Sequence, residues 1–284
     1  MIDVSVENSI RAYLSLIVDR DIAVSDSRYR EAAADIIDNP NNDLSSSYLA
    51  FDEDFYLSQR GSRRDRSLTA LRDFFQNGYR FGLSPHPLFD IDYINTVYRQ
   101  ETLAHKAKSA SEHNTVPNPL VLIFGDSFNV YSPNALFDIT NYSNSVAKAN
   151  LPGIEDLEHL HPVIHYLRYW RALHNVEALR ISDFFDPIFY DISSSRRDAS
   201  LTDPLTHYMR SSSADRNDCN PKFHGQFYSR NYGLDNIDPV THFIRFGAER
   251  GFAPNPFAYE ELGLNSTVVP PAVLRKLLLD YTKI

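Results

Sequence analysis

The sequence predicts an all-α protein: an array of about five degenerate helix-pair repeats with proline-rich connectors and helical caps at both ends. Three observations support this class. A short aromatic–acid motif recurs along the chain, Asp-Pro or Asn-Pro pairs precede apolar residues at helical spacing, and two distant segments share paired glycines and prolines. Because one two-helix unit cannot bury its own apolar face, such units must stack on one another.

Each copy of the motif opens with a phenylalanine, which is usually followed by aspartate and by a second ring four residues after the phenylalanine. The opening residues are Phe51, Phe89, Phe137, Phe185, the degraded copy at Phe223 and a remnant at Phe257. They lie 38, 48, 48, 38 and 34 residues apart, which is the period range of helical repeat arrays. The two longer spacings indicate insertions in the middle copies.

The acids of the motif are expected to cap helices. Aspartate at an N-cap accepts hydrogen bonds from free amides of the first turn and favours the positive end of the helix dipole. Calcium would need many oxygen ligands from one compact loop, and no Asp-x-Asp-x-Asp-Gly run is present. The capping aspartates are predicted to be Asp52, Asp90, Asp138, Asp186, Asp203 and Asp238. The opening phenylalanine should pack on the first turn of its own helix as a hydrophobic staple.

The connectors follow from the two best-matched segments. Each has two glycines four residues apart and then two prolines two residues apart. Gly78 and Gly247 are expected to end helices at positive φ, where glycine is favoured. The proline straps, at 84–87 and 253–256, should then lead into the next opening ring.

The repeat region is expected to cover 48–262. Residues 1–47 resemble a helical lead-in that caps the open end of the array, with a dimerising helix pair as the alternative. Residues 263–284 carry a short amphipathic helix, which is either a terminal cap or a linker to a domain outside this chain.

Composition and charge restrict the functional classes. A hydrophobic content of 43% and a charged content of 23% are typical of a folded soluble protein. The net charge of −9 argues against nucleic acid, which requires a basic face. One basic run containing Arg63 and Arg64 is either a solvated loop or a contact to an anionic partner.

The single cysteine, Cys219, excludes an internal disulfide and a cysteine-held zinc ion, and it favours a reducing compartment. The first residues do not have the pattern of a secretory signal, and no apolar run approaches the length of about 20 residues needed to span a bilayer. We therefore expect a cytoplasmic protein with no membrane span.

An esterase-like segment, 120–128, ends in Gly-Asp-Ser-Phe and offers Ser127 as a nucleophile. Such an enzyme needs a late Asp-x-x-His element to position its base. The only such element, Asp156 to His159, comes about 30 residues later, which is too early for that fold. The segment also occupies the position of a second repeat helix, which is the preferred interpretation.

Three histidines, His165, His207 and His242, occupy one repeat position, three residues after the proline of the second helix. Equivalent positions in a stack lie too far apart to share a metal ion, so each is expected to donate a hydrogen bond to a carbonyl or acid of a neighbouring unit. His159 and His161 lie close to His165 but lack an acid of suitable geometry. No catalytic residue, metal or cofactor is expected.

The combined pattern resembles a known bacterial repeat. It reads Phe-Asp-x-x-Phe/Tyr-Tyr, then Asp-Pro-Leu/Val-x-His-Tyr/Phe, then Pro-Asn/His-Pro before the next ring. Such repeats are found beside glycosyltransferase domains in large bacterial proteins that build surface polysaccharides, and similar units occur in some secreted, calcium-binding-type bacterial proteins. The resemblance covers about 48–262 and is partial in the middle copies, where Trp170 and Ser212 replace the glycine.

The resemblance implies an accessory role and supplies no catalytic residues. We therefore expect a non-catalytic interaction or scaffolding module, with a protein partner or a fused glycosyltransferase domain. One alternative is a carbohydrate-binding module that holds the glycan through loop rings such as Tyr131 and Phe252, although such rings are more often core residues. The third alternative is the esterase that would use Ser127.

Overall fold

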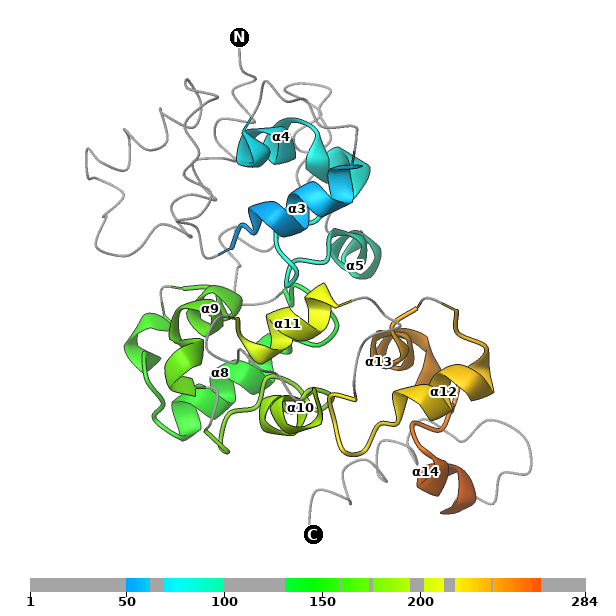
Figure 1. The fold of residues 1–284 in the computed structure, drawn as a ribbon. Coiled ribbons are helices and arrows are strands. Elements are labelled where there is room, and N and C mark those ends of the chain that lie inside the picture. The colour runs from blue at the N-terminus through cyan, green and yellow to red at the C-terminus, as the bar shows by residue number, and fades with distance from the viewer. Residues whose placement is uncertain are drawn as a thin grey trace. The chain divides into compact units, whose positions relative to one another are not determined.

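The structure is a computed structural model that describes residues 50–61, 69–99, 131–158, 160–173, 176–194, 202–211, 218–235 and 237–261. This part of the chain is mostly helical, and its only β-type pairing is an isolated bridge between Ser182 and Phe185 (Figure 1). The helical caps expected at 1–47 and 263–284 lie outside the described residues. The chain divides into two compact units, Met1–Leu173 and His174–Ile284.

The first unit contains α-helices and short 3-10 helices. In chain order they are α3 (Glu53–Arg60), α4 (Ala70–Gln76), η3 (Gly78–Phe81), α5 (Ile91–Val97), α8 (Ile139–Lys148), η4 (Ile154–Asp156) and α9 (Pro162–Leu173). Within this unit α3 packs against α4, and α8 packs against α9. The second helix that was expected to follow α5, at 119–128, lies outside the described residues.

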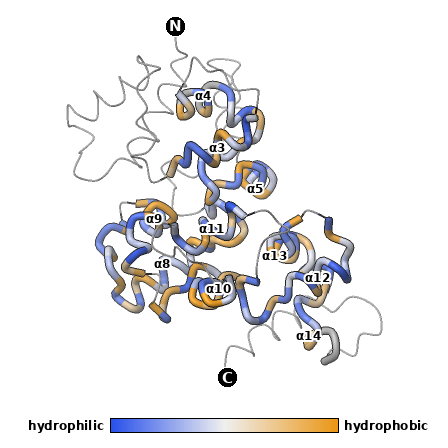
Figure 2. The backbone as a smooth tube through the Cα atoms, in the orientation of Figure 1, coloured by the Kyte–Doolittle hydropathy of each residue, from blue (hydrophilic) through white to orange (hydrophobic). Residues whose placement is uncertain are grey.

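The second unit contains two further packed pairs and a terminal helix. Its elements are α10 (Pro187–Ser194), α11 (Pro204–Arg210), α12 (Gly225–Tyr232), α13 (Pro239–His242), the π-helical turn η5 (Phe243–Gly247) and α14 (Pro256–Glu261). Helix α10 packs against α11, and α12 packs against α13. Apolar and polar residues alternate along these helices, as expected when each helix buries one face (Figure 2).

Each packed pair encloses a cluster of three rings. The opening phenylalanine lies against a tyrosine of the first helix, and both lie against a ring of the second helix or, in the last pair, of the turn η5 that follows it. The clusters are Phe51, Tyr56 and Phe74; Phe137, Tyr142 and Tyr166; Phe185, Tyr190 and Tyr208; Phe223, Tyr228 and Phe243. All these rings are buried. The phenylalanine and tyrosine occupy the two staple positions on either side of the N-cap, and ring pairs of this kind contribute about 0.5–1.5 kcal/mol each beyond their buried area.

The straps bind back to the start of the preceding first helix. The backbone carbonyl at the strap position accepts a hydrogen bond from the amide of the preceding N-cap residue, at 2.9–3.1 Å. These bonds join Asp52 to Pro85, Asp90 to Pro133, Asp186 to Cys219, and His224 to Pro254. The residue just before the strap carbonyl then accepts the first amide of the following helix, as Ser84 does from Ile91 and Ser132 does from Ile139.

The prediction that Gly78 and Gly247 adopt positive φ is wrong. The left-handed residues are the second glycines of each turn, Gly82 at 72° and Gly251 at 71°. Gly78 and Gly247 are instead needed for close approach, because a Cβ atom there would overlap the hydroxyl of Tyr56 or Tyr228. The physical reason for each glycine is thus a buried tyrosine and not the turn.

Phe257, which opens the remnant copy of the motif, is placed differently from Phe89. Phe89 is fully buried, whereas Phe257 is 70% exposed and the buried residue is its neighbour Ala258. Counted from Gly78 and Gly247, Ala258 stands at the position of Phe89, and Phe257 stands one residue earlier. The Asn255 side chain accepts the Ala258 amide at 2.8 Å where α14 begins.

We expect Gly247→Ala to lower the free energy of unfolding by about 1–3 kcal/mol, because overpacking at a rigid contact displaces the ring beside it. Chemical denaturation monitored by circular dichroism measures this change. In a Tyr228→Phe background, which lacks the overlapping hydroxyl, the same substitution should cost less. An equal cost in both backgrounds would show that the hydroxyl does not account for the glycine.

Candidate functional site

The most distinctive polar feature of the structure is a tyrosine hydroxyl bonded inside each helix pair. In three pairs the partner is the Nδ1 atom of a histidine on the second helix. The distances are 2.7 Å for Tyr142 to His165, 2.7 Å for Tyr190 to His207, and 2.9 Å for Tyr228 to His242. The histidines were predicted to bond a carbonyl or acid of a neighbouring unit. That prediction is wrong for Nδ1, because the first-helix tyrosine of the same pair lies directly opposite.

The contacts of the Tyr142–His165 pair show which nitrogen of the histidine ring carries the proton. The Nε2 atom of His165 lies 2.8 Å from the carbonyl oxygen of Gly153, which can only accept. Nε2 therefore carries the proton, and Nδ1 accepts from the Tyr142 hydroxyl. Burial lowers the pKa of His165 and raises the pKa of Tyr142, so both groups are neutral near pH 7. With both ring nitrogens bonded, His165 is a structural residue and not an available base.

The first pair uses a carboxylate where the others use histidine. Asp73 lies at the corresponding position of α4 and accepts the Tyr56 hydroxyl at 2.7 Å. Its two oxygens also accept from Arg60 at 2.7 and 2.9 Å and from Asn77 at 3.1 Å. Asp73 and Arg60 are both buried. A carboxylate with four hydrogen bonds is committed to the core and has no remaining role in acid–base chemistry.

The aspartates expected to be caps all accept amide hydrogen bonds at helix starts. The acceptors and donors are Asp52 from Phe55, Asp90 from Tyr93, Asp138 from Thr140 and Asn141, Asp186 from Ile188 and Phe189, Asp203 from Thr206, and Asp238 from Thr241. Asp238 also accepts the hydroxyl of Tyr208 at 2.7 Å, which links α11 to the start of α13. Such caps stabilise a helix by about 0.5–2 kcal/mol each.

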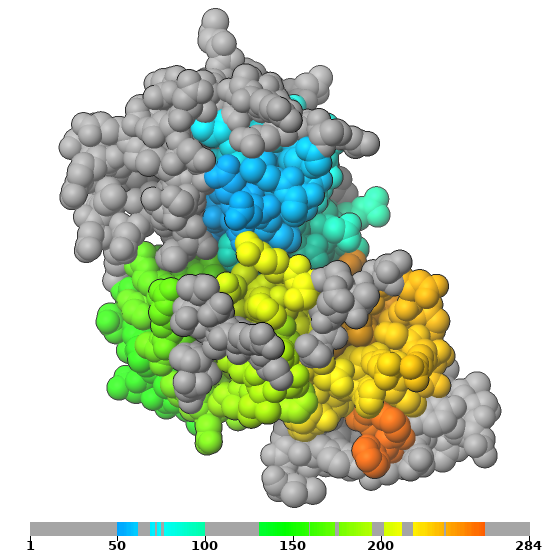
Figure 3. All heavy atoms as spheres, viewed as in Figure 1, coloured from blue at the N-terminus to red at the C-terminus, as the bar shows by residue number. Residues whose placement is uncertain are grey.

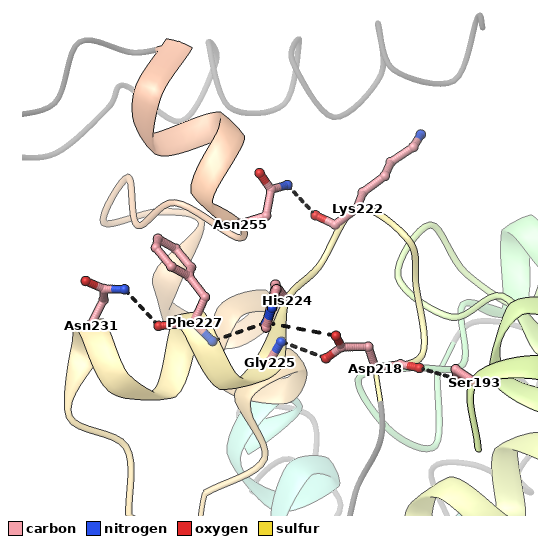
Figure 4. Close-up of polar contacts among 8 residues, drawn as sticks. All are labelled: Ser193, Asp218, Lys222, His224, Gly225, Phe227, Asn231 and Asn255. Atoms are coloured by element: carbon pink, nitrogen blue, oxygen red, sulfur yellow. Dashed lines mark hydrogen bonds and ion pairs between the residues drawn. The ribbon is translucent and has the colours of Figure 1, made fainter. Parts of the chain in front are cut away.

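One strap junction contains a serine, a histidine and an aspartate close together (Figure 4). The Ser193 hydroxyl donates to the backbone carbonyl of Asp218 at 2.9 Å, while the Asp218 carboxylate accepts the Gly225 amide at 2.7 Å. The Nδ1 atom of His224 accepts the Phe227 amide at 3.3 Å. The serine and the histidine each bond backbone, so these three side chains form a junction and not a nucleophile–base relay.

The same junction is closed by an asparagine of the next strap. The Nδ2 atom of Asn255 donates to the carbonyl of Lys222 at 2.6 Å (Figure 4). Equivalent bonds run from Asn134 to the Leu88 carbonyl and from Asn220 to the Asp183 carbonyl, both at 2.8 Å. These asparagines were not singled out from the sequence. The signal for them was present, because each follows the strap position directly.

The remaining candidate residues are placed as follows. Tyr131 is half-buried and packs edge-on against Tyr98, with ring centroids 4.8 Å apart. Phe252 is half-buried and stacks in parallel on Tyr232 at 4.0 Å. Arg63, Arg64, Ser127 and His159 lie outside the described residues.

Among the residues that the structure does describe, no group of three or more histidine, cysteine or acidic side chains could hold a metal ion. Burial raises the pKa of the Cys219 thiol, whose sulfur donates to the Phe184 carbonyl. In the same part of the chain, no helix is long and apolar enough to cross a membrane. Comparison with known proteins found no matching family, no similar curated protein and no similar solved structure.

We expect Asp73→His to lower the free energy of unfolding by about 3–5 kcal/mol, because it leaves the Arg60 guanidinium buried without its carboxylate. The double substitution Asp73→His with Arg60→Val copies the α8–α9 pair, which has Tyr142, Val146 and His165 at these positions. It should recover most of the loss in urea titrations. If the double variant is as unstable as the single one, the histidine and the aspartate are not equivalent solutions.

Proposed function

We propose that this chain is a non-catalytic interaction module whose residues 48–262 form an array of helix-pair repeats. Support for the array comes from contacts that recur at the same positions of successive copies. These are the ring staple, the tyrosine bond to histidine or aspartate, the aspartate cap, and the strap carbonyl bonded to the preceding N-cap amide. In such an array each helix-pair repeat contacts the neighbouring repeats through the straps.

One observation carries the non-catalytic assignment. In the described part of the chain, recurring side chains of the kinds used in catalysis hold helices and straps together: tyrosine bonds histidine, aspartate bonds helix amides, and serine bonds a helix amide or a strap carbonyl. We therefore place the function of the module in contacts made by the surface of the array.

The exposed rings offer contact points for a partner. In the first unit Phe81 is 67% exposed, and the Arg60 guanidinium lies 5.7 Å from its ring centroid. In the second unit Phe246 is 40% exposed and lies within 5.2 and 5.8 Å of the guanidinium groups of Arg245 and Arg250. Aromatic residues and arginine are enriched at protein interfaces and dominate their binding energy.

The proposed partner is the glycosyltransferase machinery of bacterial surface-polysaccharide assembly, as a separate protein or as a domain of the same protein. This choice follows from the repeat resemblance, and it is a proposal by analogy between repeats. Helix α14, drawn in dark orange, lies at the surface of the second unit in the face shown in Figure 3. Its Phe257 is 70% exposed and adds to the apolar contact area.

A second candidate function is glycan binding in the second unit. It is favoured by the half-exposed parallel rings of Tyr232 and Phe252 and by the His242 ring, which lies 5.6 Å from Phe246 and 6.4 Å from Phe252. Rings in such a group offer faces on which a sugar could lie, and Arg250 beside Phe246 would suit an acidic glycan.

One pair of variants tests the interaction role. Phe246→Ser with Arg250→Glu should weaken capture of the purified glycosyltransferase by at least about tenfold, because such residues are interface hot spots. Biolayer interferometry measures this change. Ile192→Ser is the matched control, because Ile192 is also exposed, at 75%, but is not an aromatic residue in contact with arginine. This variant should bind normally. No capture by the native chain would contradict the proposal.

The alternatives give different results in the same preparations. A glycan-binding module should raise its melting temperature when the polysaccharide is added, and lose that shift in Phe252→Ala. An esterase should hydrolyse p-nitrophenyl acetate and stop when Ser127→Ala is made. An interaction module should show neither response.

A further inference from the structure

Two histidines of the first unit occupy positions that asparagine or aspartate occupies elsewhere. His86 follows the strap carbonyl of Pro85, as Asn134 and Asn220 follow theirs, and its Nδ1 atom accepts the Leu88 amide at 3.2 Å. Asn134 and Asn220 accept the amide two residues later in the same way, at 2.8 Å. His161 stands directly before Pro162, as Asp203 and Asp238 stand before theirs, and accepts the Val163 amide at 3.1 Å.

Both histidines can make these bonds only when they are neutral. A protonated imidazole has two donors and no acceptor, so it would face a backbone N–H that cannot turn away. The rings are buried, with 6% of His86 and 0% of His161 exposed, so water cannot take the place of the lost bond. Burial lowers the pKa of His86 to about 3 and that of His161 to about 4, the latter opposed by a bond to the Tyr131 carbonyl.

The described contacts that hold these two rings in place are with uncharged groups. The ring of His86 lies against Phe89, with centroids 6.2 Å apart, and burial is the cause of its lowered pKa. The Nε2 atom of His161 faces the Tyr131 carbonyl at 3.3 Å. Of the acids that precede α9, Asp156 accepts the Tyr169 hydroxyl at 2.7 Å and lies 3.7 Å from Arg168, while Glu155 acts on the pKa of His165 and opposes Arg168 there.

The histidines that bond tyrosine tolerate a proton better. A hydroxyl can turn and accept from a protonated Nδ1 atom, whereas a backbone amide cannot. This applies to His165 in the first unit and to His207 and His242 in the second. In the second unit His224 caps α12 through Nδ1, but its side chain is 49% exposed and lies 4.0 Å from the Asp218 carboxylate, which can pair with the charged ring.

We propose that the first unit is an acid-sensitive element of this chain. Below about pH 6.5, where an exposed histidine takes up its proton, the opened forms of the strap at 85–88 and of the start of α9 gain a proton on His86 and His161, so each segment opens more often. The corresponding positions of the second unit carry Asn220, Asp203 and Asp238, so its strap at 218–222 has no imidazole that must stay neutral to accept a backbone amide.

The direction and size of the effect follow from proton linkage. Between pH 6.5 and the lowered pKa values of His86 and His161, the opened state of each segment binds more protons than its closed state. The stability of the closed segment is therefore complete above pH 6.5 and decreases as the pH falls. From pH 7 to pH 5 each histidine raises its own local opening equilibrium roughly 20-fold. Ordinary carboxylates remain mostly ionised over this interval.

Hydrogen exchange of the full chain at pH 7 and pH 5, expressed as protection factors corrected for intrinsic exchange, tests the proposal. We expect peptides covering 84–94 and 160–173 to lose protection roughly 20-fold, while peptides covering 218–235 keep theirs. Equal losses in both units, or no loss in the first unit, would overturn it.

Two substitutions taken from this chain's own equivalent positions give the matched variants. His86→Asn should keep protection at 84–94 at pH 5 without changing the response at 160–173, and His161→Asp should do the reverse. His224→Asn is the control and should leave the acid response of the first unit intact. Each single variant is read out at its own peptide, so one variant that folds is enough to test the proposal. The proposal is contradicted if that peptide still loses protection at pH 5.

Discussion

A buried tyrosine hydroxyl is the constraint on which each helix pair depends. The tyrosine ring fills the space between the two helices, and the side chain is buried away from solvent. An acceptor must therefore face it from the second helix, because an unsatisfied buried hydroxyl costs about 1–3 kcal/mol. Four residues act as this acceptor in the described pairs: His165, His207, His242 and Asp73. The neighbouring glycines, Gly78 and Gly247, follow from the same hydroxyl, which leaves no room for a Cβ atom.

The choice of acceptor changes what else the pair must contain. A neutral histidine brings its own donor, and in the α8–α9 pair that donor is satisfied by the Gly153 carbonyl. A carboxylate brings a charge, which must be balanced inside the core, and in the α3–α4 pair Arg60 supplies the balance from the same helix as Tyr56. The same position on the second helix can thus hold either a histidine or an aspartate, and each requires different supporting residues.

The straps apply the same rule to backbone groups. An N-cap amide is not bonded within its own helix, so the strap carbonyl that accepts it fixes the connector against the preceding helix. Serine, asparagine and histidine side chains complete the connection by bonding amides on the far side of the turn.

The sequence by itself determined the helical class and the places where helices start, since capping by Asp52 or Asp238 and the preference of proline for the first turn are local effects. It also placed His165, His207 and His242 at one recurring position. The tertiary structure decided their partner, because a tyrosine 14 to 23 residues away meets the histidine only when the helices pack. It likewise decided that Gly78 and Gly247 make room for a tyrosine while Gly82 and Gly251 make the turn, and that Ala258 is buried while Phe257 is exposed. Local propensity specifies helix ends, whereas close contacts between helices depend on distances that no single segment contains.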